Sequence, residues 1–168
     1  MKKFGRSIAL GFATVALAAF GLAAPAVAQS PQSATVTADG AIITQDGAKV
    51  GQITTHTRGD GSEPPAELGD PSEWGVVAIE MNDSPGTVKP MVEACTNPPS
   101  GGKWCYGWYS VSKGKHCYSN YLHETKSHRA TVKINNVTKA SGASPGNVAQ
   151  AWLEAGAAYT CYTYYSIA

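Results

Sequence analysis

The sequence predicts an all-β protein, and three observations support this fold class. Short runs alternate apolar and polar residues, most clearly at residues 129–135, where Ala130, Val132 and Ile134 share one face. Glycine-containing turn signals such as Asp39-Gly40 separate such runs. All eight tyrosines and three of the four tryptophans lie after residue 100, and aromatic residues favour strands.

The first half of the chain contains short β-like runs and one long break. Residues 34–37 and 41–44 are two such runs, and residues 49–57 form a longer one. Residues 58–73 are rich in Gly, Pro, Asp and Glu, which is typical of a flexible loop or linker. Residues 74–81 are apolar and predict a further strand.

The second half has stronger strand patterns. Residues 104–111 and 117–122 are aromatic-rich, and the segment 112–115 between them predicts a hairpin of the longer-loop kind. Residues 138–147 are expected to form a loop. Residues 159–167 predict a final, tyrosine-rich strand.

The first 28 residues have the pattern of a secretory signal. A basic start precedes an uncharged apolar stretch over residues 7–24, and Ala26-Val27-Ala28 supplies the small residues that a signal peptidase requires. We expect cleavage between Ala28 and Gln29 and a secreted mature chain. An uncleaved anchor is the less favoured alternative, because the apolar run is only just long enough to span a bilayer.

Charge divides the mature chain into two regions. Residues 29–100 contain three basic and ten acidic residues, a net charge of −7, whereas residues 101–168 contain seven and two, a net charge of +5. Residues 97–102 are the sharpest break in composition, so we place a boundary there: signal 1–28, acidic β-rich or partly flexible region 29–100, and C-terminal domain 101–168. The acidic region is expected either to contact and mask the basic domain or to be an unrelated accessory region.

Four cysteines in an exported chain favour disulfides, and four cysteines permit three pairings. Cys95 and Cys105 flank a Pro-Pro-Ser-Gly-Gly loop almost symmetrically. This favours Cys95–Cys105 together with Cys117–Cys161, while the sequence leaves the other pairings open.

Several stretches of the C-terminal region resemble the lactococcin 972 family of bacteriocins. They are Trp104-Cys105-Tyr106-Gly107, the string from Tyr118-Ser119-Asn120-Tyr121-Leu122-His123 to Lys126-Ser127-His128-Arg129, and the segments 145–151 and 162–165. The resemblance implies a small β-sandwich of two antiparallel sheets. It also implies bacteriocin activity: binding of the cell-wall precursor lipid II and disturbance of septum formation in related bacteria. At residues 148–156 it implies a strand, although the composition there favours a helical turn or two.

Lipid II presents a pyrophosphate, sugars and a peptide, so a binder needs cationic donors for the phosphates and aromatic faces for the sugars. The alternative is that the tyrosines pack in the core, which is favoured for them, and that the lysines form a solvated face. The candidate ligand-binding residues are Tyr118, Tyr121, His123, Lys126, His128, Arg129 and Lys133.

The sequence predicts no enzyme, metal or cofactor. His123 and His128 are five residues apart, whereas a zinc-protease helix needs histidines at i and i+4. A metal site at His116, Cys117 and these two histidines is disfavoured, because Cys117 is more useful in a disulfide outside the cell.

The expected partner is lipid II or the envelope of related bacteria, with no nucleic acid; the formation of a homodimer is left open. A cell-wall hydrolase is disfavoured, because Glu124 and Glu154 are the only carboxylate side chains after residue 100. The main alternative function is a secreted structural or interaction protein that keeps the β-sandwich without killing bacteria.

Overall fold

The computed structural model describes residues 32–79, 92–156 and 158–168. The expected signal, its cleavage site at Ala28 and Gln29, and the end of the strand expected at residues 74–81 lie outside these ranges. Among the described residues, no helix has the length and apolar character needed to cross a bilayer.

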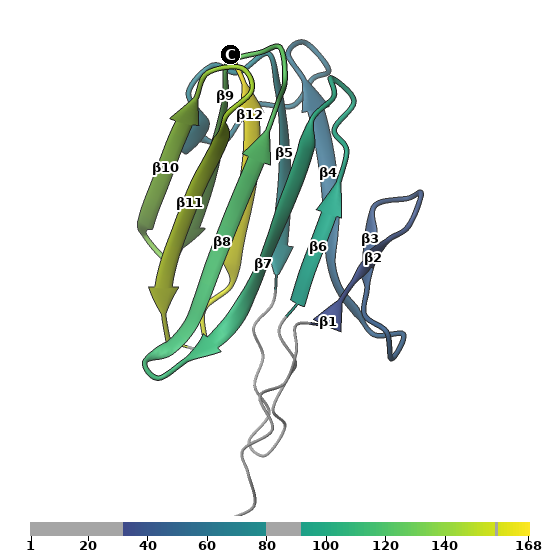
Figure 1. The fold of residues 1–168 in the computed structure, drawn as a ribbon, viewed down its shortest axis with the longest axis vertical. Coiled ribbons are helices and arrows are strands. Elements are labelled where there is room, and N and C mark those ends of the chain that lie inside the picture. The colour runs from purple at the N-terminus through teal and green to yellow at the C-terminus, as the bar shows by residue number, and fades with distance from the viewer. Residues whose placement is uncertain (1–31, 80–91, 157) are drawn as a thin grey trace, which may run out of the picture.

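Twelve strands form two sheets that pack face to face (Figure 1). Neighbouring strands are antiparallel, apart from the short parallel pair of β1 and β6. Sheet A contains, in spatial order, β1 (Gln32–Ser33), β6 (Val92–Thr96), β7 (Lys103–Val111), β8 (Gly114–Leu122) and β11 (Val148–Ala155). Sheet B contains β10 (Val137–Ala143), β9 (His128–Ile134), β12 (Cys161–Ile167), β5 (Glu73–Ile79), β4 (Lys49–Thr57), β3 (Ala41–Ile43) and β2 (Thr35–Val36). The all-β sandwich predicted from the sequence is confirmed.

Strands from both sides of residue 100 share each sheet. The later segment contributes three adjacent strands to each: β7, β8 and β11 to sheet A, and β10, β9 and β12 to sheet B. The earlier segment adds β6 beside β7 and β5 beside β12. The sandwich is therefore not confined to residues 101–168, because backbone pairing continues it into the acidic region.

The space between the sheets is filled by aromatic rings. Trp104, Tyr106, Tyr121 and Tyr165 are almost completely buried there. The indole Nε1 of Trp104 donates a hydrogen bond to Ser119 Oγ (2.9 Å), and this hydroxyl donates to a carbonyl oxygen of β12 (2.9 Å). Pairing these polar atoms matters, because a buried donor without a partner costs stability.

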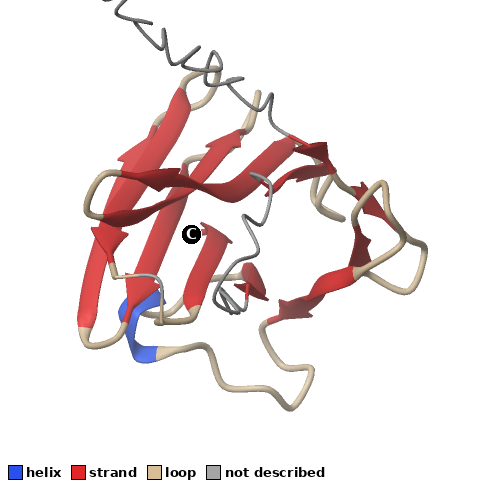
Figure 2. Cartoon of the chain, turned by 90° about the horizontal axis from the view of Figure 1, so that it is seen from below, coloured by secondary structure: helices blue, strands red, loops and turns tan. Residues whose placement is uncertain are grey.

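The segment over residues 58–72 covers part of the outer face of sheet B. It contains the 3-10 helix η1 (Ala66–Leu68), which is blue in Figure 2. Leu68 packs there with Trp74 and Tyr164 in a second, smaller buried cluster. The flexible loop or linker expected for residues 58–73 is thus a loop that packs on the sheet, because apolar side chains of β5 and β12 also point outward.

Two local predictions are wrong. The hairpin between β7 and β8 has a two-residue turn, since Val111 pairs with Gly114. The expected loop at residues 138–147 contains β10, whose side chains are mostly exposed and which pairs with β9 along its whole length. This edge strand is held by backbone pairing with β9, and its exposed side chains need not be apolar. Its sequence therefore shows no alternating apolar pattern. Residues 148–155 form β11, as the family resemblance implies.

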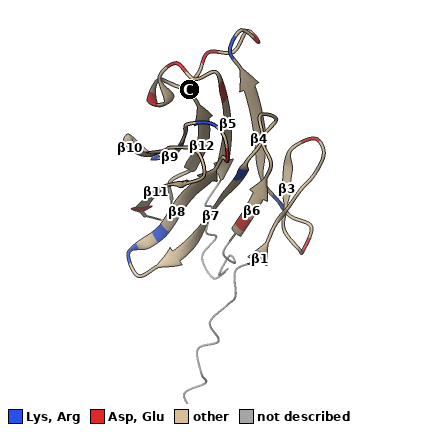
Figure 3. Cartoon of the chain, turned by 45° about the horizontal axis from the view of Figure 1, so that its top comes forward, with Lys and Arg blue, Asp and Glu red and all other residues tan. Residues whose placement is uncertain are grey.

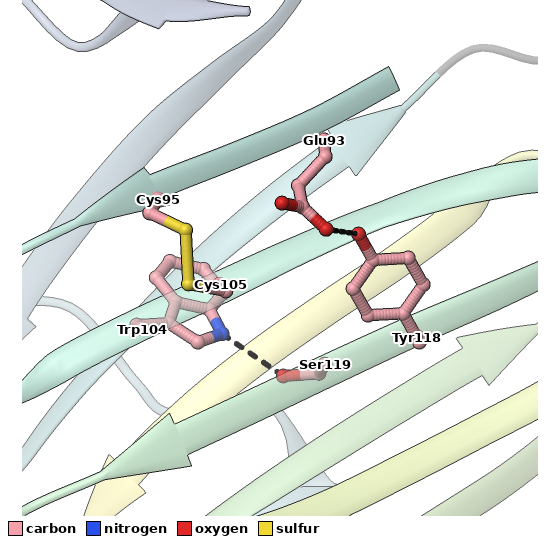
Figure 4. The surroundings of a disulfide bond; sticks show 6 residues. All are labelled: Glu93, Cys95, Trp104, Cys105, Tyr118 and Ser119. Atoms are coloured by element: carbon pink, nitrogen blue, oxygen red, sulfur yellow. Dashed lines mark hydrogen bonds between the residues drawn. A yellow bond between two sulfur atoms is a disulfide. The ribbon is translucent and has the colours of Figure 1, made fainter. Parts of the chain in front are cut away.

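Both favoured disulfides are present. Cys117–Cys161 joins β8 of sheet A to β12 of sheet B in the buried core. Cys95–Cys105 joins β6 to its neighbour β7 on the outer face of sheet A (Figure 4).

The first prediction concerns these two disulfides. Replacing Cys117 and Cys161 by Ala should lower the free energy of unfolding by about 4 kcal/mol, because the bond closes a long loop between the two sheets. The matched change at Cys95 and Cys105 should cost about 3 kcal/mol or less, because the loop is short and the strands are already paired. Denaturant unfolding of both variants tests this, and an equal or larger loss for the Cys95–Cys105 variant would contradict it.

Candidate functional site

The two candidate tyrosines lie on opposite faces of β8. Tyr118 is on the outer face of sheet A, whereas Tyr121 is buried between the sheets, because residues three apart on a strand point in opposite directions. Tyr121 donates a hydrogen bond to the carbonyl oxygen of Gly101 (2.9 Å), and burial raises the pKa of its hydroxyl to about 12. Tyr121 is therefore a core residue and does not share a surface with Tyr118.

The two candidate histidines are buried and shape the loop between β8 and β9. His123 Nδ1 accepts hydrogen bonds from the backbone of Thr125 and Lys126 (3.2 and 3.1 Å), so its proton is on Nε2, which donates to Ser100 O (3.0 Å). His128 Nδ1 lies 2.8 Å from Lys126 O and donates to it. These contacts hold the loop in shape, and the two residues are only 3% and 4% exposed, although His128 lines a hollow beside Arg129.

Lys126 and Arg129 are the candidate cations that remain exposed. Neither forms an ion pair within the part of the chain that the structure describes. Arg129 lines a hollow of about 440 Å³ at the end of the sandwich, between the 68–71 loop and the ends of β10 and β12, which we call the Arg129 hollow. An exposed guanidinium beside a hollow is suited to binding phosphate or carboxylate oxygens.

Lys133, the third candidate cation, is paired with the acidic region. Its Nζ lies 3.0 Å from Glu67 Oε1, which also accepts a hydrogen bond from the Tyr164 hydroxyl (2.9 Å). Burial raises the pKa of Glu67, but hydrogen bonds from Lys133, the backbone and Tyr164 outweigh it, so the net pKa is lowered. Figure 3 shows acidic residues in the loops that precede β5, and this ion pair is a point where they meet a basic strand.

A second hollow, of about 340 Å³, lies on the outer face of sheet A, which we call the sheet A aromatic face. Its side chains come from alternate positions of four neighbouring strands, β6, β7, β8 and β11. They are Glu93, Tyr109, His116, Tyr118, Asn120, Gln150 and Trp152.

Three rings of this face form a stack across three strands. His116 stacks on Tyr109 at a centroid distance of 4.5 Å and on Trp152 at 5.0 Å. Glu154 Oε1 lies 3.3 Å from His116 Nδ1 and fixes the imidazole within the stack.

Tyr118 lies across β7 toward β6 (Figure 4). Its hydroxyl donates a hydrogen bond to Glu93 Oε2 (2.5 Å), and burial together with this bond raises the pKa of Tyr118. Gly107 pairs with both residues, and only glycine fits there, because a Cβ would lie 2.0 Å from Val92 O of β6. Glu93 thus holds the Tyr118 ring down over the sheet.

Sequence reasoning found Tyr118 but missed the rest of this face. The signal was the alternation of His116, Tyr118 and Asn120 on β8, matched by Gln150 and Trp152 on β11. The partner of Tyr118, Glu93, lies 25 residues earlier and could be found only from the strand pairing. Among the described residues, no group of three or more His, Cys, Asp or Glu side chains is placed to hold a metal ion.

The fold and these surfaces define a disulfide-bonded β-sandwich with open hollows on its exterior. Residues 100–165 match the family model described as Bacteriocin (Lactococcin_972). This part of the chain is similar to the lactococcin 972 family of bacteriocins, which confirms the resemblance seen in the sequence. The search of curated proteins and the search of solved structures each found no significant match.

The family match covers β7 to β11 and β12 as far as Tyr165, and these strands are the three adjacent ones that the later segment contributes to each sheet. Arg129, Lys126 and most of the sheet A aromatic face lie within it. Glu93 and Glu67 lie outside, in the segment that extends the sheets.

The second prediction concerns Glu67. Because its folded pKa is lowered, its ionised form stabilises the protein above the unfolded value of 4.5, and this stability is lost as the pH falls through the folded pKa. Glu67→Gln should therefore lower the free energy of unfolding by about 1 kcal/mol at pH 7 and by little at pH 3. Urea unfolding at both pH values measures this.

Asp70→Asn is the matched control, because Asp70 and its partner Arg58 are both largely exposed. It should change the stability little at either pH. A pH-independent loss for Glu67→Gln would show that the carboxylate does not contribute through its charge.

Proposed function

We propose that this protein is a secreted, bacteriocin-like antibacterial protein that binds a cell-envelope target, lipid II, and disturbs septum formation. The observation that carries the proposal is the family match, which includes three whole strands of sheet A and, in sheet B, β9, β10 and most of β12. The two disulfides support an oxidising, extracellular location, and the expected signal over residues 1–28 supports export. The proposed action is binding without catalysis.

The Arg129 hollow is the surface that best suits the pyrophosphate of lipid II. Arg129 is exposed on its rim, and Lys126 is exposed on the adjoining loop. A guanidinium offers two parallel N–H donors to phosphate oxygens, and an ammonium adds a second positive charge. The buried His123 and His128 support this site indirectly, because they fix the loop that carries Lys126.

The third prediction tests the target. Mature protein titrated with lipid II-containing vesicles should bind saturably and more tightly than to plain anionic vesicles. Replacing both Lys126 and Arg129 by Ala should weaken the lipid II binding at least about tenfold, or about 1.4 kcal/mol, because both phosphate contacts are lost. The same variant should inhibit related bacteria less.

The control variant carries Lys113→Ala together with Lys103→Ala, which removes the same charge from two exposed lysines away from the hollow. It should bind like the wild type. Equal binding to both kinds of vesicle, or an equal loss in the control, would favour a structural or interaction protein instead.

A further inference from the structure

The sheet A aromatic face is separate from the Arg129 hollow. It lies on the outer face of sheet A, whereas Arg129 points outward from sheet B. Its lining residues include no lysine or arginine. Lys139 is the cation at its edge, with Nζ 5.4 Å from the centroid of the Trp152 ring, so the lining itself recognises a ligand through aromatic and amide groups.

Its aromatic rings are open to solvent although they are large. Trp152 is 49% exposed, and Tyr109 and Tyr118 are partly exposed. The stack of Tyr109, His116 and Trp152 forms one wall, and the Tyr118 ring lies over the sheet beside it (Figure 4). The Tyr118 ring is the floor of the hollow, and the stacked rings are its wall. Such a shape suits a flat, rigid ligand. The electronegative faces of aromatic rings attract polarised C–H groups of the ligand.

The polar groups of the face are amides rather than charges. Asn120 and Gln150 line the hollow from neighbouring strands, where they pair directly. Neither side-chain amide bonds to another described residue. Each amide offers a carbonyl acceptor and two N–H donors, which match sugar hydroxyls and, in particular, the N–H and C=O of an acetamido group.

We propose that the sheet A aromatic face binds a glycan built of N-acetylated hexosamine rings. The pyranose C–H face packs on Tyr118 and against Trp152, and Asn120 and Gln150 bond the acetamido group. This inference goes beyond the proposed function, because it requires neither lipid II nor a phosphate and uses the opposite face of the sandwich.

Glu93 and the neighbouring disulfide make this face specific to the longer chain. Glu93 holds Tyr118 down, and Cys95, two residues away, ties β6 to β7 beside it (Figure 4). Both groups of β6 lie before the family match at residue 100. The segment that extends the sheets therefore completes a binding face whose other residues lie within the family domain.

The experiment titrates the full mature chain with chitohexaose, a soluble oligomer of N-acetylglucosamine, and follows tryptophan fluorescence. Cellohexaose, which has the same backbone without acetamido groups, is the comparison. Chitohexaose should bind saturably and at least about tenfold more tightly than cellohexaose. Trp152→Ala should weaken chitohexaose binding at least about tenfold.

Tyr162→Ala is the matched control, because Tyr162 is a similarly exposed aromatic residue on the other sheet. It should leave chitohexaose binding unchanged. If Trp152→Ala does not fold, Gln150→Ala replaces it and should also weaken the binding, because it removes one amide partner. Absence of chitohexaose binding, equal binding of cellohexaose, or unchanged binding in the Trp152 and Gln150 variants would overturn the proposal.

The sugar probe contains no lipid and no phosphate, so the two proposals fail separately. Loss of chitohexaose binding with intact lipid II binding overturns this inference alone. Chitohexaose binding without lipid II binding overturns the proposed target, lipid II, and supports glycan binding at the sheet A aromatic face.

Discussion

The backbone pairing of β12 on both of its edges is the interaction on which the two sheets depend. All seven residues from Cys161 to Ile167 pair with β9 on one side and with β5 on the other. Cys161 also bonds to Cys117 of the facing sheet, and the Tyr165 ring packs on Trp104 and Tyr121. The Tyr165 hydroxyl donates to the buried Glu73 (2.8 Å), so this single strand joins both sheets and both halves of the chain.

The pairing of β5 and β6 with the later strands indicates the structural role of the acidic region, residues 29–100. A region that masks a basic domain and then leaves must have separable contacts, such as the ion pair of Glu67 with Lys133. The strands β5 and β6, however, supply seven and five backbone-paired residues beside β12 and β7. Removal of residues 29–100 would therefore expose two unpaired sheet edges and the apolar groups under β5. The acidic segment is best understood as an extension of the sandwich, and any masking is confined to its loop over residues 58–72.

The sequence predicts the strands well and the surfaces poorly, for a physical reason. Residues 129–135 alternate apolar and polar side chains because one face of β9 is buried. The tyrosine-rich run before Ile167 likewise belongs to a largely buried strand, so both strands lie where the sequence predicts them. The sequence does not predict β10, because the side chains of this edge strand are mostly exposed and do not alternate between apolar and polar. The favoured disulfides also form, because strand pairing places Cys95 opposite Cys105, and packing of the two sheets brings Cys117 of β8 beside Cys161 of β12.

The positions of the candidate site residues depend on which face of each strand they occupy, and the order of residues in the sequence does not reveal this. Tyr118 to Arg129 look like one cluster of aromatic and basic residues, yet alternation along β8 sends Tyr121 inward and Tyr118 outward. Among the candidates, the exposed cation Arg129 consequently lies on sheet B, Lys126 lies in the loop before it, and the partly exposed Tyr118 lies on sheet A. Phosphate and sugar chemistry, expected at one site, are separated by the thickness of the sandwich.

This separation carries a mechanical consequence for a protein that acts at a bacterial surface. A ligand the size of one lipid headgroup does not reach both the Arg129 hollow and the sheet A aromatic face, because the two sheets and the buried core between them separate the two surfaces. Under the two proposals, different envelope components occupy the two faces together, and the sandwich holds them at a fixed distance. Linked binding of this kind raises the apparent affinity without any new contact at either site. The extended sheets therefore do more than stabilise the fold, since β6 brings Glu93 to one face while the 68–71 loop, just before β5, walls the hollow on the other.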